Sequence, residues 1–403
     1  QWWCQPAPSP LTPGRARGGA CRAAQAAAAA ARAKARRRRR RPRESSSSSS
    51  GSGGRGASRA PRGTMHPLIL KGHTRPLTCV KYNREGDLLF SCSKDNQPTV
   101  WYSDNGERLG TFEGHRGTVW SLDVTSDSKF LVTGGADMSV KVWNVQTGEK
   151  LHDFPHTGPV KCVEWAEGGR MFVSVSDPFR GAPATVAIYD FTGNVEDQPQ
   201  EPKYVWESTG VEQGKKLTMA TWLPLNKNIL TCDAEGVMRV HEVETGRVIR
   251  ELKEHTKKIN ALSWNKEKYL LVTGSADNSA KLWDPEEWKV LKTYETDRPV
   301  NAVAISPIKE HVFVAGGQEA MNVTTTSAKV GKFETKLFHM VFGEEFGTVR
   351  GHFGPVNSVA VHPDGTGFTS GSEDGYIRIH NFDKDYFSLH SELDDLNALS
   401  QLS

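Results

Sequence analysis

The stretch GHRGTVWSLDVTSDSKFLVTGGADMSVKVW, from Gly114 to Trp143, decides the fold. It contains three short runs in which apolar and polar residues alternate, and clusters of Ser, Asp, Lys and Gly separate these runs. Such a pattern is typical of successive β-strands joined by tight turns. The stretch also begins with Gly-His and has Asp137 six residues before Trp143, so its recurrence along the chain can be measured at fixed positions.

Three further copies of this pattern keep the same spacing. In every copy a His lies 28 residues before the final Trp or His, and an Asp lies six residues before that final position. The four copies contain His73, Asp95 and Trp101; His115, Asp137 and Trp143; His255, Asp277 and Trp283; and His352, Asp374 and His380. A pattern repeated at fixed spacing indicates an architecture in which each unit covers the apolar face of its neighbour.

Three degenerate copies occupy the intervals between the regular ones. One begins at His156 with Tyr189 in the Trp position, one has Glu235 and His241 in the Asp and Trp positions, and one after Val300 lacks both His and Trp. The total is seven units of roughly 40 residues, the spacing of WD40 repeats. We therefore predict an all-β fold: a seven-bladed WD40 β-propeller over residues 65–387, preceded by a disordered N-terminal extension and followed by a C-terminal tail over residues 388–403.

The ends of the predicted ring can be matched to each other. The last unit has only three expected strands, and the strand-like segment at residues 65–71 has no unit of its own. We expect this segment to supply the outer strand of the seventh blade, which would join the two ends of the ring and protect an open sheet edge.

A Ser or Thr also recurs in the regular units, between the His and the Asp. In WD40 proteins these side chains and the Trp form a hydrogen-bonded set within the blade, because a buried indole N–H and a buried imidazole both need partners. A His, an Asp and a Ser also resemble a catalytic triad, but an active site is needed once, whereas a structural set is needed in every blade. We interpret the sets as structural. Their members are His73, Ser91, Asp95, Trp101, His115, Thr133, Asp137, Trp143, His255, Thr273, Asp277, Trp283, His352, Ser370 and Asp374.

Charge divides the 403-residue chain into two unlike parts. Residues 1–64 carry 15 of the 51 Lys and Arg residues but only one acidic residue, Glu44, so the remainder has a net charge of about −10. A body this acidic argues against a broad nucleic-acid-binding surface. The six cysteines show no zinc-ligand spacing and no disulfide is required by a core of this size, so we expect reduced thiols. No apolar run is long enough to span a membrane.

Residues 1–64 are rich in Ala, Arg and Ser and cannot bury enough apolar surface to fold. Three interpretations stay open. The segment is upstream sequence that does not belong to the native protein, a solvated tail, or a targeting segment whose six-Arg run at Arg36–Arg41 acts as a nuclear signal or whose composition acts as a transit peptide. We favour the first interpretation, because Met65 starts the first strand-like segment.

Function is expected where the units depart from the repeat, because a propeller by itself is a scaffold. In the third unit, residues 177–183 and 192–203 are expected to be surface insertions. In the sixth unit, residues 316–349 contain a long alternating segment, FETKLFHMVF, with more apolar residues than one outer strand needs. It is either an exposed edge that binds a partner peptide or helix, or a longer strand packed on its own blade. The candidate partner-binding residues are Gln318, Glu319, Met321, Lys332, Phe333, Lys336, Phe338, Met340 and Phe342.

Several segments of the chain resemble one family in particular. YNREGDLLFSCSKD, RPVNAVAISP, GGQEAMNVTTT, GKFETK and GHFGPVNSVAVHPDG followed by SEDGYIRIHNFD are similar to the WD40 subunit I of eukaryotic translation initiation factor 3, the TGF-β receptor-interacting protein family. The similarity runs from Met65 to Phe387 and is weakest in the third and fourth units. It implies a non-catalytic cytoplasmic subunit that supports preinitiation complex assembly on the small ribosomal subunit and mRNA.

The same resemblance implies the partners. In that family the propeller associates with two other subunits of the factor, those named B and G. The first of them contributes largely a helix from its C-terminal part, and we call it the helix-donating subunit. The contact lies around the fifth and sixth blades, here between about Asn260 and Phe342. The resemblance also implies that the family protein begins at the position of Met65.

Other functions fit the sequence less well. A WD40 adaptor in RNA processing, chromatin or receptor signalling stays the alternative, with the Arg run as its nuclear signal. A ubiquitin-ligase receptor is disfavoured, because Trp283-Asp284 is followed by Pro285 and Glu286 rather than by an Arg two residues later. No phosphate-binding loop, zinc-protease motif or hydrolase motif occurs, so we expect no enzyme activity, no cofactor, no metal, no small-molecule substrate and no membrane association.

Overall fold

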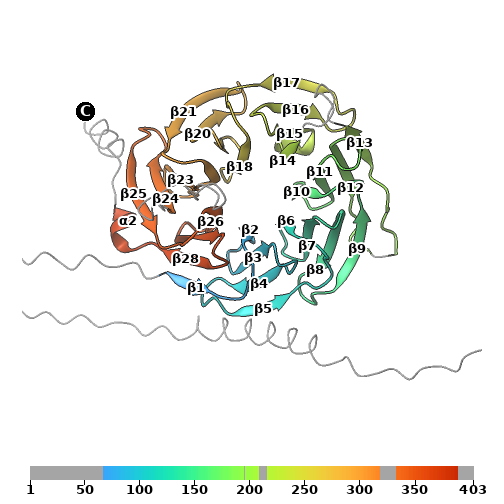
Figure 1. Cartoon of the computed structure of the whole chain (residues 1–403), viewed down its shortest axis with the longest axis horizontal. Coiled ribbons are helices and arrows are strands. Elements are labelled where there is room, and N and C mark those ends of the chain that lie inside the picture. The colour runs from blue at the N-terminus through green and yellow to red at the C-terminus, as the bar shows by residue number, and fades with distance from the viewer. Residues whose placement is uncertain (1–66, 195, 208–215, 318–332, 389–403) are drawn as a thin grey trace, which may run out of the picture. The chain divides into compact units, whose positions relative to one another are not determined.

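The computed structural model describes residues 67–194, 196–207, 216–317 and 333–388. Within them the strands form seven four-stranded antiparallel sheets, which are arranged around a ring as the blades of a propeller (Figure 1). The predicted all-β class and the seven blades are confirmed. The predicted N-terminal extension lies outside the described residues, as does all but Ser388 of the predicted tail, so both stay predictions.

The blades are numbered from one to seven in the chain order of their innermost strands, which face the centre of the ring (Figure 1). The innermost strands are β2 (Leu77–Tyr82), β6 (Val119–Val124), β10 (Val160–Trp165), β14 (Leu217–Trp222), β18 (Ile259–Trp264), β22 (Val300–Ile305) and β26 (Val356–Val361). The second strands are β3 (Leu88–Ser93), β7 (Phe130–Gly135), β11 (Met171–Ser176), β15 (Asn228–Asp233), β19 (Leu271–Ser275), β23 (His311–Gly316) and β27 (Gly367–Ser372).

The third strands are β4 (Thr99–Tyr102), β8 (Ser139–Asn144), β12 (Thr185–Asp190), β16 (Met238–Glu242), β20 (Ser279–Asp284), β24 (Glu334–His339) and β28 (Ile377–Asn381). The outermost strands are β5 (Arg108–Thr111), β9 (Lys150–Pro155), β13 (Tyr204–Glu207), β17 (Val248–Leu252), β21 (Lys289–Glu295), β25 (Glu345–Arg350) and β1 (Leu68–Leu70). A short 3-10 turn, η1 (Pro224–Asn226), follows β14, and a five-residue helix, α2 (Lys384–Ser388), follows β28.

The first described strand closes the ring. β1 pairs antiparallel with β28, with Leu70 opposite Ile377, so the seventh blade consists of β26, β27, β28 and β1. In Figure 1 the blue strand β1 lies beside the red strand β28. The closure that the sequence predicts for residues 65–71 is therefore confirmed for the described part of that segment.

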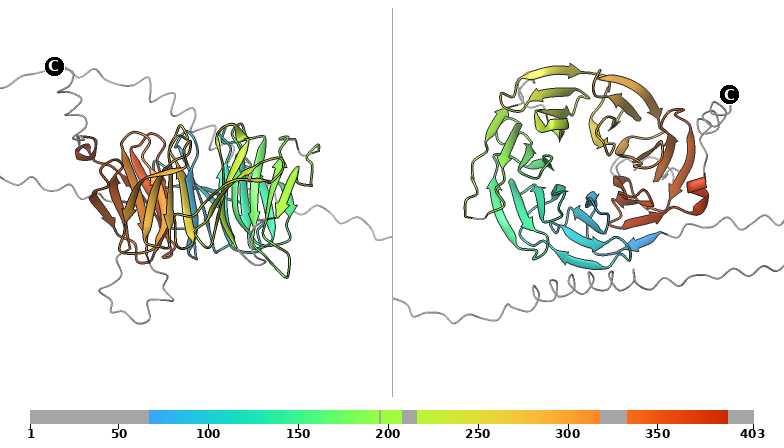
Figure 2. Two further views of the ribbon diagram at one scale, coloured as in Figure 1. Left: turned by 90° about the horizontal axis from the view of Figure 1, so that it is seen from above. Right: turned by 180° about the vertical axis from the view of Figure 1, so that it is seen from behind.

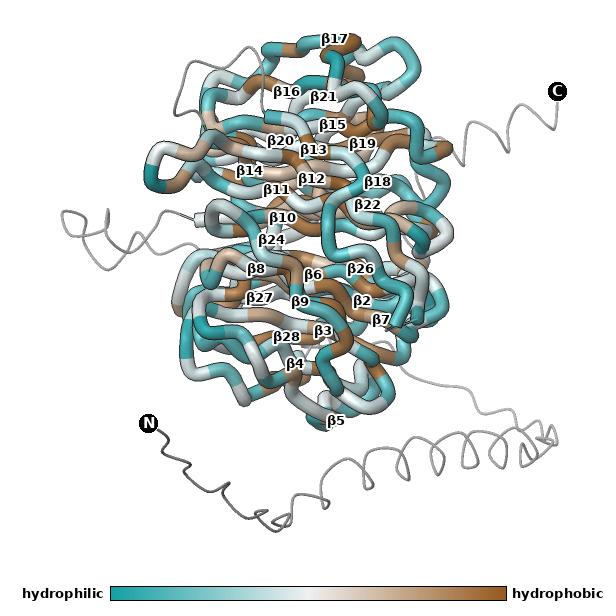
Figure 3. The backbone as a smooth tube through the Cα atoms, turned by 90° about the vertical axis from the view of Figure 1, so that its right-hand side faces the viewer, coloured by the Kyte–Doolittle hydropathy of each residue, from teal (hydrophilic) through white to brown (hydrophobic). Residues whose placement is uncertain are grey.

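Most of the core lies between neighbouring blades. Along the tube of Figure 3, hydrophobic residues are concentrated in the strands and many of the connecting loops are hydrophilic. One cluster joins Val272 and Tyr294 of the fifth blade to Val303 and Val312 of the sixth. Seen edge-on in the left panel of Figure 2, the strands of each blade run roughly along the axis of the ring. Because the ring is closed, each blade has a neighbour on both of its faces. Each blade is therefore stabilised by its neighbours, as in other repeat proteins.

The expected hydrogen bonds of the blade sets are present. In the second blade His115 Nδ1 donates to Asp137 Oδ2 at 2.9 Å, and Trp143 Nε1 donates to Thr133 Oγ1 at 2.8 Å. Thr133 Oγ1 also lies 2.7 Å from His115 Nε2. The first and fifth blades repeat these contacts with their own residues. Although burial alone would raise it, the hydrogen bond and charge of His115 lower the pKa of Asp137 to about 2.

The seventh blade keeps the His–Asp–Ser contacts but replaces the Trp. His352 Nδ1 lies 3.0 Å from Asp374, and its Nε2 lies 2.8 Å from Ser370 Oγ. In the first blade a Cβ on Gly72 would lie 2.5 Å from the Trp101 ring, which explains why Gly precedes the His. The equivalent Cβ in the seventh blade would lie 2.6 Å from the Arg378 guanidinium, so Arg378 fills the space that a Trp ring fills elsewhere.

His380 makes the stability of this blade depend on pH. Burial, together with the neighbouring His352 and Arg378, lowers the pKa of His380 to about 4. An unfolded His has a pKa of about 6.5, so the fold favours the neutral ring, and this stability is lost as the pH falls from 6.5 towards 4. The unfolding free energy of the parent should fall between pH 7.5 and 5. In His380→Phe, which keeps a ring stacked on Phe368, this fall should be smaller by about 2 kcal/mol. Denaturant titrations at the two pH values measure the difference, and an equal loss in both proteins would contradict it.

The third and fourth blades depart from the repeat where the sequence indicates. Residues 177–184 form a loop between β11 and β12, in which Phe179 and Ala182 make an isolated β-bridge, and residues 191–203 connect β12 to β13. In the fourth blade Arg239 Nη1 lies 2.9 Å from Asp233 Oδ2, both side chains being buried.

Among the described helices, none is long and apolar enough to cross a membrane.

Candidate interaction groove between the fifth and sixth blades

A groove of about 580 Å³ lies between the fifth and sixth blades, on the face of the ring where the innermost strands end. Three loops and one outer strand surround it: residues 265–270 after β18, residues 306–310 after β22, the turn at Met340 and Val341 after β24, and the start of β21. Its lining consists of Asn265, Lys266, Glu267, Tyr269, Leu270, Leu282, Leu291, Lys292, Ile305, Ser306, Pro307, Ile308, Lys309, Glu310, Met340 and Val341. We call this feature the 5–6 groove.

The walls of the 5–6 groove are held by hydrogen bonds within their loops. The Leu270 amide donates to Asn265 Oδ1 at 2.9 Å, which fixes the loop of the fifth blade. In the sixth blade the Met340 amide donates to the Glu310 carbonyl at 2.7 Å, and Tyr294 Oη of the fifth blade donates to the Met340 carbonyl at 2.7 Å. The groove is therefore preformed, which limits the ordering cost of binding a partner.

Four exposed apolar side chains gather around this groove. Tyr269, Leu291, Ile308 and Val341 have between 48% and 59% of their surface exposed, while Leu282, Ile305 and Met340 are buried beneath them. An exposed apolar cluster with a polar rim marks a protein-interaction site more often than scattered single residues do. Both signs of charge lie on the rim, with Lys266, Lys292 and Lys309 beside Glu267 and Glu310. The arrangement suits an amphipathic helix, whose apolar face would contact the four exposed side chains.

Comparison with known proteins places the chain in a family. A family model described as EIF3I matches residues 65–392. The chain belongs to this family. It is 45% identical to the eukaryotic translation initiation factor 3 subunit I of Bombyx mori over 325 residues, which covers 80% of this chain and 97% of the relative. It is also 45% identical to the subunit I of Nematostella vectensis over 328 residues, covering 81% of this chain and the whole relative.

A fungal member extends the same similarity. The subunit I of Kluyveromyces lactis is 43% identical over 334 residues, covering 82% of this chain and 96% of the relative. Membership of the EIF3I family makes the chain a translation initiation factor subunit, and the resemblance noted in the sequence is confirmed. Residues 393–403 follow the end of the family match.

Two of the candidate partner-binding residues predicted from the sequence are buried. Phe338 and Met340 have only 4% and 8% of their surface exposed, because both fill the space between the fifth and sixth blades of this EIF3I-family propeller. The expectation that they lie on an exposed edge is wrong. This part of the segment instead matches the other possibility, a strand packed within its own blade. β24 pairs with β23 on one side and with β25 on the other.

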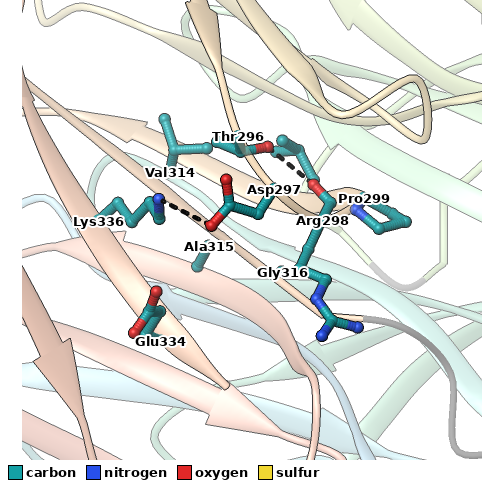
Figure 4. Close-up of a pocket in the computed structure, with 10 residues that line it drawn as sticks. Thr296, Asp297, Arg298, Pro299, Val314, Ala315, Gly316, Glu334 and Lys336 are labelled. Carbon is teal, nitrogen blue, oxygen red and sulfur yellow. Dashed lines mark hydrogen bonds and ion pairs between the residues drawn. The ribbon is translucent and has the colours of Figure 1, made fainter. Parts of the chain in front are cut away.

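The other candidates divide into two groups. Phe342 is exposed and Phe333 is half-buried. Lys336 is held by ion pairs, 2.9 Å from Glu345 and 4.0 Å from Asp297. Figure 4 shows Lys336 directed towards Asp297 at a small hollow of about 30 Å³, on the face opposite the 5–6 groove. Gln318, Glu319, Met321 and Lys332 lie outside the described residues.

Sequence reasoning missed Tyr269, Leu291 and Ile308 as individual residues, although the range carried over from the EIF3I family, from about Asn260 to Phe342, includes them. A signal was present in the repeat. Ile308 stands in the turn position that holds Glu85 in the first unit and Asp127 in the second. An apolar residue in a turn that is otherwise acidic identifies a site where the repeat has been modified.

Proposed function

We propose that the chain is a non-catalytic scaffold subunit of eukaryotic translation initiation factor 3 that acts in the cytoplasm. In this role it binds other subunits of the factor, those named B and G, and supports assembly of the preinitiation complex on the small ribosomal subunit and mRNA. Membership of the EIF3I family supports this proposal, and the observation that carries its mechanism is the preformed 5–6 groove with its four exposed apolar side chains.

The 5–6 groove is the proposed seat of the helix from the C-terminal part of the helix-donating subunit. A helix presents residues at i, i+3, i+4 and i+7 on one face, and such anchors dock into apolar grooves of this kind. The buried residues Leu282, Ile305 and Met340 form the floor, so anchors between the walls would displace water from apolar surface. The mixed charges of the rim would fix the orientation of the helix.

The geometry of the blade sets supports a scaffold rather than a hydrolase. In each of the first, second and fifth blades the Ser or Thr hydroxyl already accepts a hydrogen bond from the Trp indole and contacts the His ring. Ser91, Thr133 and Thr273 are fully buried, so no substrate can reach these hydroxyl groups without opening the blade. Hydroxyl groups in this setting stabilise the fold.

The double variant Leu291→Asp, Ile308→Asp tests the groove. We expect it to weaken binding of the C-terminal region of the helix-donating subunit at least about tenfold, because each anchor contact at an interface core contributes roughly 1–2 kcal/mol. Both residues are exposed, so the unfolding free energy should change by less than about 1 kcal/mol. Calorimetric titration with that purified C-terminal region measures the first quantity, and denaturant unfolding measures the second.

A matched control is available on other blades. Val205→Asp, Ile249→Asp adds the same charge at equally exposed apolar positions on β13 and β17. This control should bind the helix-donating subunit as the parent does. Equal affinity of the groove variant and the control would contradict the groove as the binding site. The wider role is tested by affinity purification from native extract with mass spectrometry: recovery without other factor subunits would favour the alternative, an adaptor in RNA processing, chromatin or receptor signalling.

A further inference from the structure

The chain leaves the propeller beside the 5–6 groove. After β28 it forms α2, whose Tyr386 is buried and lies against Phe382 with ring centroids 3.8 Å apart. Tyr386 Oη lies 2.8 Å from His311 Nδ1, at the start of β23. These contacts anchor α2 to the sixth and seventh blades and fix the point from which residues 389–403 continue.

One loop separates this anchor from the groove. Residues 306–310 connect β22 to β23, and all five of them, from Ser306 to Glu310, line the 5–6 groove. His311, the partner of Tyr386, follows Glu310 directly. Burial raises the pKa of Tyr386 to about 12, and a hydrogen bond with Ser306 opposes this shift, so Tyr386 contacts both ends of the loop. The wall of the groove is thus also the support of α2.

The sequence that follows α2 has the pattern of an amphipathic helix. Leu389, Leu393, Leu396 and Leu399 recur at spacings of four, three and three residues, which places them along one helical face. Acidic residues stand between these leucines in the sequence, at Glu392, Asp394 and Asp395. Most of this pattern lies beyond residue 392, where the match to the EIF3I family ends, so it is a feature of this chain rather than of the family match.

Charge and reach both fit the groove. The three acidic residues of the segment complement Lys266, Lys292 and Lys309, which outnumber the two acidic residues of the rim. A helix over residues 389–402 would be about 20 Å long, and each of its first residues would instead span about 3.3 Å where the chain is extended. That is enough to cross one five-residue loop and lie along a groove between two blades.

We propose that the 5–6 groove binds the chain's own C-terminal segment, residues 389–402, as an amphipathic helix. Leu393, Leu396 and Leu399 contact the exposed side chains of the groove, and the carboxylates face the lysines of the rim. The segment therefore occupies the site until another helix displaces it. The competition rests on the function proposed above, whereas the docking of the segment does not.

The tether determines the strength of this competition. A segment attached a few residues from its site has an effective concentration in the millimolar range. A short helix that binds with a Kd of about 0.1–1 mM would then be bound for half to nine-tenths of the time. A competing helix can bind only while the segment is away from the groove, so the apparent affinity of that helix falls about twofold to tenfold.

Chemical protection of the groove tests the docking without any partner. Leu291→Cys places a thiol in the groove of the full-length chain, and Ile249→Cys places an equally exposed thiol on the fourth blade. We expect N-ethylmaleimide to modify the thiol at position 291 about twofold to tenfold faster when Leu393→Asp, Leu396→Asp is added, because the thiol is then no longer covered. The control pair Asn397→Asp, Gln401→Asp adds the same charge on the other helical face and should leave the rate unchanged. Peptide mass spectrometry assigns each modified thiol.

Each outcome decides the proposal. The proposal is supported if the Leu pair, and not the control pair, speeds modification at position 291. The rate at position 249 should stay unchanged, and the result should be the same at every protein concentration. Equal rates in all variants overturn it, and protection that disappears on dilution overturns it in favour of a second copy's segment. Because no other protein is present, the result does not depend on whether the groove binds the helix-donating subunit, and that question is answered separately by the groove variants above.

Discussion

Replacing Phe338 by Asp is expected to lower the free energy of unfolding by about 4–5 kcal/mol, a large part of the stability of an ordinary protein. Phe338 lies in the third strand of the sixth blade, with its ring 5.5 Å from that of Tyr294 in the fifth blade. An Asp at this position would leave a cavity and bury a carboxylate with no cation in the surrounding apolar cluster. Any loss of partner binding in this variant should therefore follow from the weakened fold.

Phe342→Asp is the matched control for this prediction. Phe342 follows the same strand but is exposed, so the same change of residue should cost less than about 1 kcal/mol. Denaturant unfolding followed by Trp fluorescence compares both variants with the parent. A Phe338→Asp protein with the midpoint of the parent would show that the ring of Phe338 is not part of the core between the fifth and sixth blades.

The contrast between these two residues shows where sequence reasoning reached its limit. An alternating strand normally has one apolar face in the core and one polar face in water. In a propeller both faces of a blade pack on neighbouring blades, so apolar residues on either face can be buried. The apolar residues of FETKLFHMVF pack on both faces of the blade, with Phe338 and Met340 against the fifth blade and Leu337 against the seventh. Apolar residues are exposed only where the strand ends, at Val341 and Phe342.

The blades themselves could be predicted from the sequence for a physical reason. The His, the Asp and the hydroxyl of each regular blade must meet within hydrogen-bond distance, and this requirement fixes their separation along the chain. His73 and Asp95 are separated by as many residues as His352 and Asp374. In each pair the His Nδ1 lies within 3.0 Å of an Asp carboxylate oxygen. The requirement leaves the Trp position freer, because Arg378 fills that space in the seventh blade.

The 5–6 groove could not be predicted residue by residue from the same pattern. Its walls come from loops around Tyr269, Ile308 and Val341 and from the outer strand at Leu291, which lie far apart in the sequence. Only the closure of the ring brings these side chains together. The resemblance to a family pointed to the same pair of blades as the groove, whereas the residues that line the groove are known only from the structure.

The strand that closes the ring carries the second large effect. Leu70→Asp is expected to lower the free energy of unfolding by about 4 kcal/mol. Leu70 is buried in a cluster with Leu77, Trp101 and Ile377, which join the first blade to the seventh. A carboxylate there would release β1 from β28 and expose the edge of the seventh blade. The loss should exceed that of the cavity alone, because an open ring no longer holds its first and last blades against each other.

Ile69→Asp separates closure from the general effect of a charge on this strand. Ile69 is the neighbouring residue of β1, opposite Arg378, and its side chain is exposed, so this variant should unfold at nearly the same denaturant concentration as the parent. For Leu70→Asp, far-UV circular dichroism and Trp fluorescence should report transitions that no longer coincide, since the blades next to the opened edge unfold before the others. If Leu70→Asp unfolds in one transition at the midpoint of Ile69→Asp, the ring is stable without its closing strand, and the first and seventh blades are held together by β2, β26 and β27 alone.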